Sequence, residues 1–391
     1  MKNAVQLPIV IIFFLIIAFI YISHLYYFAE ICDGWCIADW LINFDAGFVR
    51  RGLSGYLIIT LSDLIGIKAN FTTFWIQSFI YISFLIILYV LLYRKQLTFW
   101  YWILLLSPVT LLFPIYDKPA TGRKEIILFF LFGLYMLVLN RKIISSSLIT
   151  ILFFLAIIIM TLCHEGLFFY TPYFVVASYL KLKSEGQPFD FKSLYLMASS
   201  LLVLVVIYLF GQTINGTIIC DGLMKRGIHG EICDGVLVWK TSFSEALKFI
   251  LEKKYLPGYF FTFILGIAPF ILFVKYSAVH FISFKKIIAS VLLLILFSVA
   301  LFVRTIDWGR WLNIHFVLLM LLFTFFLKNK PITLEESDKP MEDDRKKSPL
   351  LKKVIIVLVT VVYLTTWSTS VYKIPLVGFK FYKTISEICN K

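Results

Sequence analysis

The stretch "LPIVIIFFLIIAFIYISHLYYFA", residues 7–29, decides the fold class of this chain because it contains no Asp, Glu, Lys or Arg. An α-helix rises about 1.5 Å per residue, so about 20 apolar residues cross the hydrocarbon core of a bilayer. The run is too long for the core of a signal peptide, and no small-residue cleavage site follows it. We therefore interpret it as a retained transmembrane helix.

The composition extends this interpretation to the whole chain. Of the 391 residues, 60% are hydrophobic and 15% are charged, and the mean hydropathy is +0.89, a balance that soluble globular domains do not show. Apolar runs recur to the end of the sequence, and no alternating pattern indicates barrel strands. The sequence predicts an all-α integral membrane helical bundle that forms a single transmembrane domain over residues 1–391.

About eleven membrane crossings are expected from the lengths of these runs. The segment "GYLIITLSDLIGI", residues 55–67, is too short to cross unaided and indicates an interfacial or re-entrant helix within a first outer loop, 30–70. The runs around Pro114 and His164 are short, which leaves tilted or broken helices open there. The expected spans are 7–29, 71–93, 98–115, 126–140, 147–163, 167–180, 193–212, 257–275, 286–303, 312–327 and 354–372.

The short loops favour an N-terminus in the cytoplasm. With that orientation the loops "RKQ" at 94, "NRK" at 140 and "FKK" at 284 lie inside and carry Lys or Arg without an acid. A large periplasmic loop, 213–256, then lies outside. The linker 328–353 mixes charges of both signs and is expected to be disordered in the cytoplasm. The inverted orientation would make the arginines at 50 and 51 an ordinary positive-inside signal.

Four cysteines fall on the predicted outer face, where disulfides can persist. Cys32 and Cys36 lie in "CDGWC", and Cys220 and Cys233 flank a second short segment. Two local bridges are one interpretation, and unbonded small apolar residues are the other.

The net charge of +14 is spread over loops on both sides of the membrane, without a folded basic domain that would bind nucleic acid. Membrane lipids with anionic head groups are the simpler partner. The sequence contains no P-loop, no dinucleotide fingerprint and no His/Cys cluster at metal-ligand spacing, so we expect neither a metal nor a cofactor. Any energy source must arrive with the substrate.

Arginines mark the predicted outer face. The motif "NFDAGFVRRGL", residues 43–53, carries two of them. The planar guanidinium suits bidentate contacts with phosphate oxygens, so these side chains are candidates for binding a pyrophosphate. The candidates are Arg50, Arg51, Arg123, Arg226, Arg304 and Arg310.

Acids and a histidine fall on the same side and are candidates for catalysis: Glu165, Asp45, His164 and Asp307. Ionisable groups at membrane depth are costly and are usually retained for pairing, transport or catalysis. Structural readings stay open. His164 and Glu165 can form a helix-end pair, and Asp307 can pair with Arg304 and Arg310 on one helical turn.

The size, the apolar character, the enlarged outer loop and the outer arginines resemble the O-antigen polymerases (Wzy) of lipopolysaccharide biosynthesis and related capsule polymerases. The short Arg-x-x-x-Gly pattern of that family is matched by Arg51 to Gly55, and by Arg226 to Gly230 in the large loop. The resemblance implies transfer of a growing glycan from undecaprenyl pyrophosphate to a new lipid-linked repeat unit. It also implies the bacterial inner membrane as the location and a chain-length regulator protein as a further partner.

A second resemblance is to the GT-C glycosyltransferases, which place a catalytic acid in the first outer loop and use lipid-phosphate sugar donors. Asp45 occupies that place here. A transporter of lipid-linked oligosaccharides could use the same arginines, although the sequence shows no internal repeat. Under either enzymatic interpretation, Glu165 or Asp45 is the expected general base, with His164 as its orienting partner.

Overall fold

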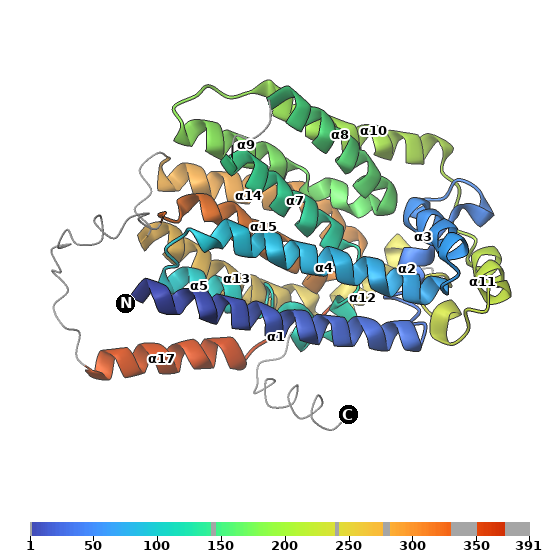
Figure 1. Cartoon of the computed structure of the whole chain (residues 1–391), viewed down its shortest axis with the longest axis horizontal. Coiled ribbons are helices and arrows are strands. Elements are labelled where there is room, and N and C mark those ends of the chain that lie inside the picture. The colour runs from blue at the N-terminus through green and yellow to red at the C-terminus, as the bar shows by residue number, and fades with distance from the viewer. Residues whose placement is uncertain (1, 142–145, 239–241, 277–281, 330–349, 372–391) are drawn as a thin grey trace.

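The computed structural model describes residues 2–141, 146–238, 242–276, 282–329 and 350–371. Within these residues every regular element is an α-helix or a 3₁₀-helix, and the only extended pairings are two isolated bridges. The long helices lie side by side along the longest axis of the molecule (Figure 1). The expected all-α membrane bundle is therefore confirmed.

Six helical segments among the described residues are long and apolar enough to cross a membrane. Every other expected crossing is shorter, so the count of eleven stays a prediction. The long elements are α1 (Lys2–Glu30), α4 (Ala69–Tyr93), α10 (Leu194–Phe210) preceded by η4 (Phe191–Ser193), α13 (Tyr255–Tyr276), α14 (Phe284–Arg304), and α15 (Trp308–Leu322) continued by η6 (Phe323–Phe326).

The remaining expected crossings correspond to shorter helices. These are α5 (Phe99–Leu106), α7 (Glu125–Arg141), α8 (Ser146–Cys163), α9 (Pro172–Ser184) and α17 (Leu350–Thr365). The interfacial helix expected at 55–67 is α3 (Gly52–Ile65). Short elements complete the fold: α2 (Ala38–Leu41), η1 (Phe44–Ala46), α6 (Phe113–Tyr116), η2 (Lys118–Ala120), η3 (Glu165–Tyr170), α11 (Gly216–Lys225), η5 (Glu231–Cys233) and α12 (Phe243–Glu252). Most of the predicted linker, residues 330–349, lies outside the described residues.

In the span 98–115, where the sequence left a broken helix open, the chain does break after α5. Ser107 precedes Pro108 and takes an extended backbone conformation with ψ 140°. A proline disfavours the helical conformation of the residue before it and lacks the N–H that would continue the ladder. The Thr110 hydroxyl then donates to the Ser107 carbonyl at 3.0 Å, which closes the turn. The open question around His164 is also settled as a break, with η3 between α8 and α9.

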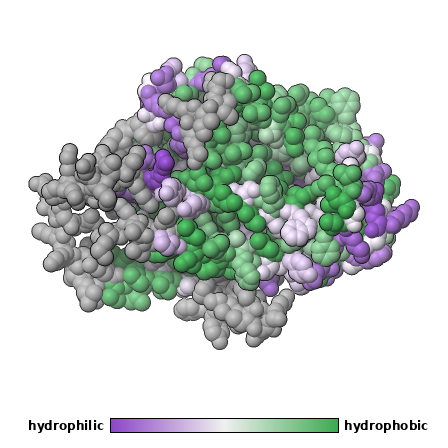
Figure 2. Space-filling model, viewed as in Figure 1, coloured by the Kyte–Doolittle hydropathy of each residue, from purple (hydrophilic) through white to green (hydrophobic). Residues whose placement is uncertain are grey.

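Helix α15 forms the centre of the bundle, and 94% of its most apolar window is buried. Outer helices leave apolar side chains exposed, such as Leu296 of α14 at 67% and Leu358 of α17 at 59%. The face of the molecule in Figure 2 is hydrophobic over its middle, while hydrophilic residues gather at the end where α11 lies. This distribution is that of a bundle whose sides contact lipid.

The short elements α2, α3 and α11 gather at one end of the bundle, which we call the motif end (Figure 1). Helix α1 ends there at Glu30, and α4 starts there at Ala69. Helix α3 packs on α2 through Gly55, where an added Cβ would lie 2.1 Å from the Ile42 carbonyl oxygen. The backbones can approach this closely only because Gly55 has no side chain.

Gly55→Ala is expected to lower the stability of the protein in detergent by about 1–3 kcal/mol, because the new methyl group overlaps the Ile42 backbone. Thermal unfolding measures the effect. Gly133→Ala is the matched control within a helix, since its Cβ would meet side-chain atoms and no backbone, the nearest being a methyl group of Ile87 at 3.1 Å. Equal melting temperatures for the two variants would contradict the close approach of α2 and α3.

Candidate functional site

Arg51 links three distant segments of the chain at the motif end. Its Nε donates to Glu165 Oε2 at 2.9 Å and its Nη2 donates to Glu165 Oε1 at 3.1 Å. Its Nη1 donates to Asp39 Oδ1 at 3.3 Å. One guanidinium thus joins the loop before α3, the short helix α2 and the start of η3.

The backbone of Arg51 is in the left-handed region, with φ 65°, where it precedes the first residue of α3. Lys124 supports this turn. Its Nζ donates to the Arg51 carbonyl at 3.4 Å and to the Cys163 carbonyl at 3.0 Å, and it lies 3.9 Å from Asp39 Oδ1. The Lys124 side chain is fully buried, so its charge depends on these oxygens for compensation.

The electrostatics of this group keep the two acids ionised. Burial raises the pKa of Asp39, but Lys124 and Arg51 outweigh it and hold that pKa well below its usual range. Burial also raises the pKa of Glu165, and Arg51 again outweighs it, so this pKa is low as well. Burial lowers the pKa of Lys124, and Asp39 restores only part of the loss. Both acids are therefore carboxylates at neutral pH.

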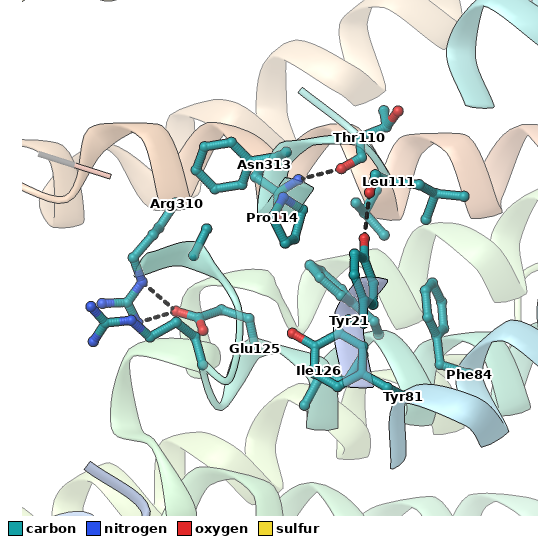
Figure 3. A pocket seen from close by; sticks show the side chains of 15 residues that line it. Tyr21, Tyr81, Phe84, Thr110, Leu111, Pro114, Glu125, Ile126, Arg310 and Asn313 are labelled. Carbon is teal, nitrogen blue, oxygen red and sulfur yellow. Dashed lines mark hydrogen bonds and ion pairs between the residues drawn. The ribbon is translucent and has the colours of Figure 1, made fainter. Parts of the chain in front are cut away.

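A second buried ion-pair group lies beside the first. Arg310, at the start of α15, donates from Nε to Glu125 Oε1 at 2.9 Å (Figure 3). Its Nη1 donates to Asp307 Oδ2 at 2.8 Å. Its guanidinium carbon lies 5.3 Å from the centre of the Trp311 ring. Arg310 and Asp307 do satisfy one another, as one structural reading expected, but Glu125 is the more buried partner.

His164 lies between the two groups and is 1% exposed. Its Nδ1 accepts a hydrogen bond from the Gly166 N–H at 3.1 Å, and its ring meets Trp311 edge-on. Burial, reinforced by Arg51, lowers the pKa of His164 well below its ordinary value. A neutral imidazole that accepts at Nδ1 carries its hydrogen on Nε2.

One edge of the site is exposed and carries Arg50 and Arg304, and we call it the open edge. Arg50 is 52% exposed and lies 3.4 Å from Glu165 Oε1, and Arg304, at the end of α14, is exposed. Burial lowers the pKa of Arg50, Glu165 raises it, and the neighbouring charges of Arg51 and Arg304 lower it again. Arg50 and Arg304 thus repel each other across a surface where, in the described part of the chain, only Glu165 pairs with Arg50.

Three of the candidates from the sequence lie apart from this edge. Asp45 is exposed, and its carboxylate faces Gly222 of α11. Arg226 forms an exposed ion pair with Asp63 of α3. Arg123 is buried, donates to the Pro119 carbonyl at 2.8 Å and lies over the Trp35 ring.

The structure brings the other candidates together: Arg50, Arg51, His164, Glu165, Arg304, Asp307 and Arg310. Sequence reasoning missed three buried members of the site, Asp39, Lys124 and Glu125. Asp39 lies four residues before the motif, and the other two directly follow Arg123. Their type alone was a signal, because a Lys or Asp at membrane depth needs a partner.

The first half of the large outer loop is bound to the first outer loop along its length. Gln212 N–H donates to the Phe48 carbonyl at 2.7 Å, and Val236 N–H donates to the Gly34 carbonyl at 2.8 Å. Cys220 and Cys233 form the expected disulfide inside this loop. For Cys32 and Cys36 the other interpretation holds, since they are not bonded to each other.

Both of these cysteines are buried and free. Cys36 Sγ instead donates to the Thr121 carbonyl at 3.0 Å, and Cys32 Sγ lies 3.7 Å from the Ala29 carbonyl. Among the described residues, no group of three or more His, Cys, Asp or Glu could hold a metal ion.

The fold and this arrangement define a class: a polytopic helical membrane protein with a buried network of ion pairs at one end. The model of a family described as "uncharacterised membrane protein Rv1490" matches residues 7–260, more than half of the chain, and the chain belongs to that family. The matched part contains Arg51, Lys124 and Glu165 and ends before α15. No curated protein and no solved structure matches the chain.

Arg310→Met is expected to lower the free energy of unfolding by about 3–5 kcal/mol, because it leaves the buried Glu125 carboxylate uncompensated. The matched control is Arg226→Met, which removes an exposed pair and is expected to cost less than about 1 kcal/mol. Denaturation of the purified protein in detergent measures both. Equal losses of unfolding free energy in the two variants would contradict a buried Glu125 carboxylate that depends on Arg310.

Stability is expected to fall as the pH drops below about 6.5, because His164 takes up a proton in the unfolded chain but not in its buried site. His164→Asn keeps an acceptor for the Gly166 N–H and removes this titration. The variant is expected to reduce the slope of unfolding free energy against pH by up to about 1.4 kcal/mol per pH unit. Unfolding measured from pH 7.5 to 5 tests this, and an unchanged slope in the variant would contradict a neutral His164.

Proposed function

We propose that the protein is a membrane glycosyltransferase that polymerises undecaprenyl-pyrophosphate-linked oligosaccharide repeat units. The product would be an O-antigen or capsule-type polysaccharide, made at the outer face of the bacterial inner membrane. The observation that carries the proposal is the open edge, where the exposed Arg50 pairs with the ionised Glu165 and the charge of Arg304 lies near enough to disfavour that of Arg50. A pyrophosphate would relieve the repulsion between these guanidinium groups.

The reaction needs a base and a stabilised leaving group. The acceptor hydroxyl oxygen would bond to the anomeric carbon of the donor as the bond from that carbon to the pyrophosphate oxygen breaks. Arg50 and Arg304 would stabilise the charge that develops on the pyrophosphate. The hydroxyl proton would pass to the Glu165 carboxylate, whose side chain is 18% exposed.

Donor binding would also make Glu165 a better base. At rest Arg51 and Arg50 both bond to Glu165 and keep its pKa low, which makes it a poor proton acceptor. Phosphate oxygens that draw Arg50 away would weaken this effect and raise the pKa of Glu165. His164 would then orient the start of η3 through its bond from the Gly166 N–H.

One observation favours a GT-C type glycosyltransferase as a second candidate. An acid of the first outer loop does lie in the charged site, but it is Asp39 rather than Asp45. Asp39 is ionised and 2% exposed, so a substrate would reach it only after the site opened. Such an enzyme would add a single sugar from a lipid-phosphate donor instead of polymerising repeat units.

Deletion of the gene in its host, followed by electrophoresis of the surface polysaccharide, is expected to collapse the ladder of long chains to one repeat unit. A ladder that survives without a branch sugar would favour the GT-C candidate. An unchanged polysaccharide would contradict both. Complementation with Arg50→Gln or Arg304→Gln is expected to restore less than a tenth of the long chains, because each variant removes a phosphate contact at the open edge.

Arg226→Gln is the matched control and is expected to restore the ladder, since Arg226 lies apart from that edge. Immunoblots of the membrane fraction verify that all three variants accumulate equally. Full activity of both open-edge variants would remove the pyrophosphate site from the proposal.

A further inference from the structure

A small cavity lies inside the bundle, behind the Arg310 ion pair. It is lined by side chains from α1, α4, α7 and α15 and from the broken region after α5. Figure 3 shows Glu125 bonded to Arg310, with Tyr21, Tyr81 and Asn313 among the other residues that line the cavity. Its volume is about 20 Å³, which is room for one water molecule and not for a sugar or a phosphate.

The wall of this cavity includes a carboxylate that is only half satisfied. Glu125 is 5% exposed, and its Oε1 accepts both hydrogen bonds from Arg310. Its Oε2 is buried and has no hydrogen-bond partner. A buried carboxylate oxygen without a donor is expensive, because it has lost its hydration without replacement.

The charges around the cavity restrict what can occupy it. Arg310 and Arg123 are among the residues that line the cavity, and their positive charges disfavour a cation. The carboxylate of Glu125 disfavours an anion. A neutral molecule that donates to Oε2 fits both restrictions and the volume.

Two other polar side chains of the wall, Tyr21 and Asn313, are committed to backbone carbonyls. The Tyr21 hydroxyl donates to the Leu111 carbonyl, and the Asn313 amide nitrogen donates to the Val109 carbonyl at 2.9 Å and the Thr110 carbonyl at 3.0 Å. These bonds fix the broken segment after α5 against α1 and α15. They leave none of these donors directed at Glu125.

We infer that this cavity binds one structural water molecule, which donates a hydrogen bond to Glu125 Oε2. The water completes the coordination of the carboxylate and thereby keeps the Arg310 and Glu125 pair ionised inside the bundle. The inference does not depend on the proposed function, because it concerns only the packing behind the charged site.

A structure of the full-length protein in lipid nanodiscs, at a resolution that shows ordered water, tests the inference directly. The expected result is a density peak in the cavity at a hydrogen-bond distance, about 2.5–3.0 Å, from Glu125 Oε2. An empty cavity would overturn the inference. So would a peak that contacts other groups of the wall but not Glu125.

A substitution gives a second test whose sign differs between a wet and a dry cavity. Val317 of α15 lines the cavity and is 2% exposed, and Val317→Ile adds one methylene group there. If water is bound, the variant displaces it and lowers the melting temperature, because Glu125 Oε2 loses its donor. If the cavity is dry, the methylene fills empty space and the melting temperature stays equal or rises.

Val291→Ile, in a buried position of α14 that does not line the cavity, is the matched control for the strain of an added methylene. The expected result is a larger loss in Val317→Ile than in the control, together with disappearance of the water peak. A loss no larger than in the control, or an increase, would overturn the inference.

Discussion

The site at the motif end depends on the pairing of Arg51 with Asp39 and Glu165. A charge in a poorly hydrated bundle must be compensated at short range, because the cost of desolvating it is several kcal/mol. The three partners come from the loop before α3, from α2 and from η3. These segments must therefore end at the same side of the membrane, and Lys124 ties the Arg51 turn to the end of α8.

The network separates a paired interior from an open edge. Arg310 and Lys124 are buried and engaged with acids or carbonyls, so they hold the helices in place. Arg50 and Arg304 are exposed, and the charge of Arg304 disfavours that of Arg50, so both could accept an added anion. Glu165 lies between these two layers, which is why a ligand at the edge would change its proton affinity.

Much of the fold could be predicted from the sequence, whereas the site was only partly predictable. Long apolar runs predict the long helices, and Gly and Pro residues mark where some of the shorter helices end. The sequence left a break in the span 98–115 open, and Pro108 explains where the helix ends. Asp45 was chosen for its position next to the arginines, but its side chain faces α11, while Asp39 points into the network. The backbone between Asp39 and Asp45 decides which of the two carboxylates faces the arginines, and the local sequence does not specify its course.

By itself, the sequence determined the class of protein, a helical membrane bundle with its acids and arginines placed near the ends of apolar runs. That information is local, because crossing a bilayer requires only a run of apolar residues of sufficient length. Only the tertiary structure decided which charges pair, which stay exposed, and that Glu125 keeps one oxygen toward a cavity. The pairs of Arg51 with Glu165 and of Arg310 with Glu125 join residues more than a hundred positions apart, and such contacts are set by how the helices pack.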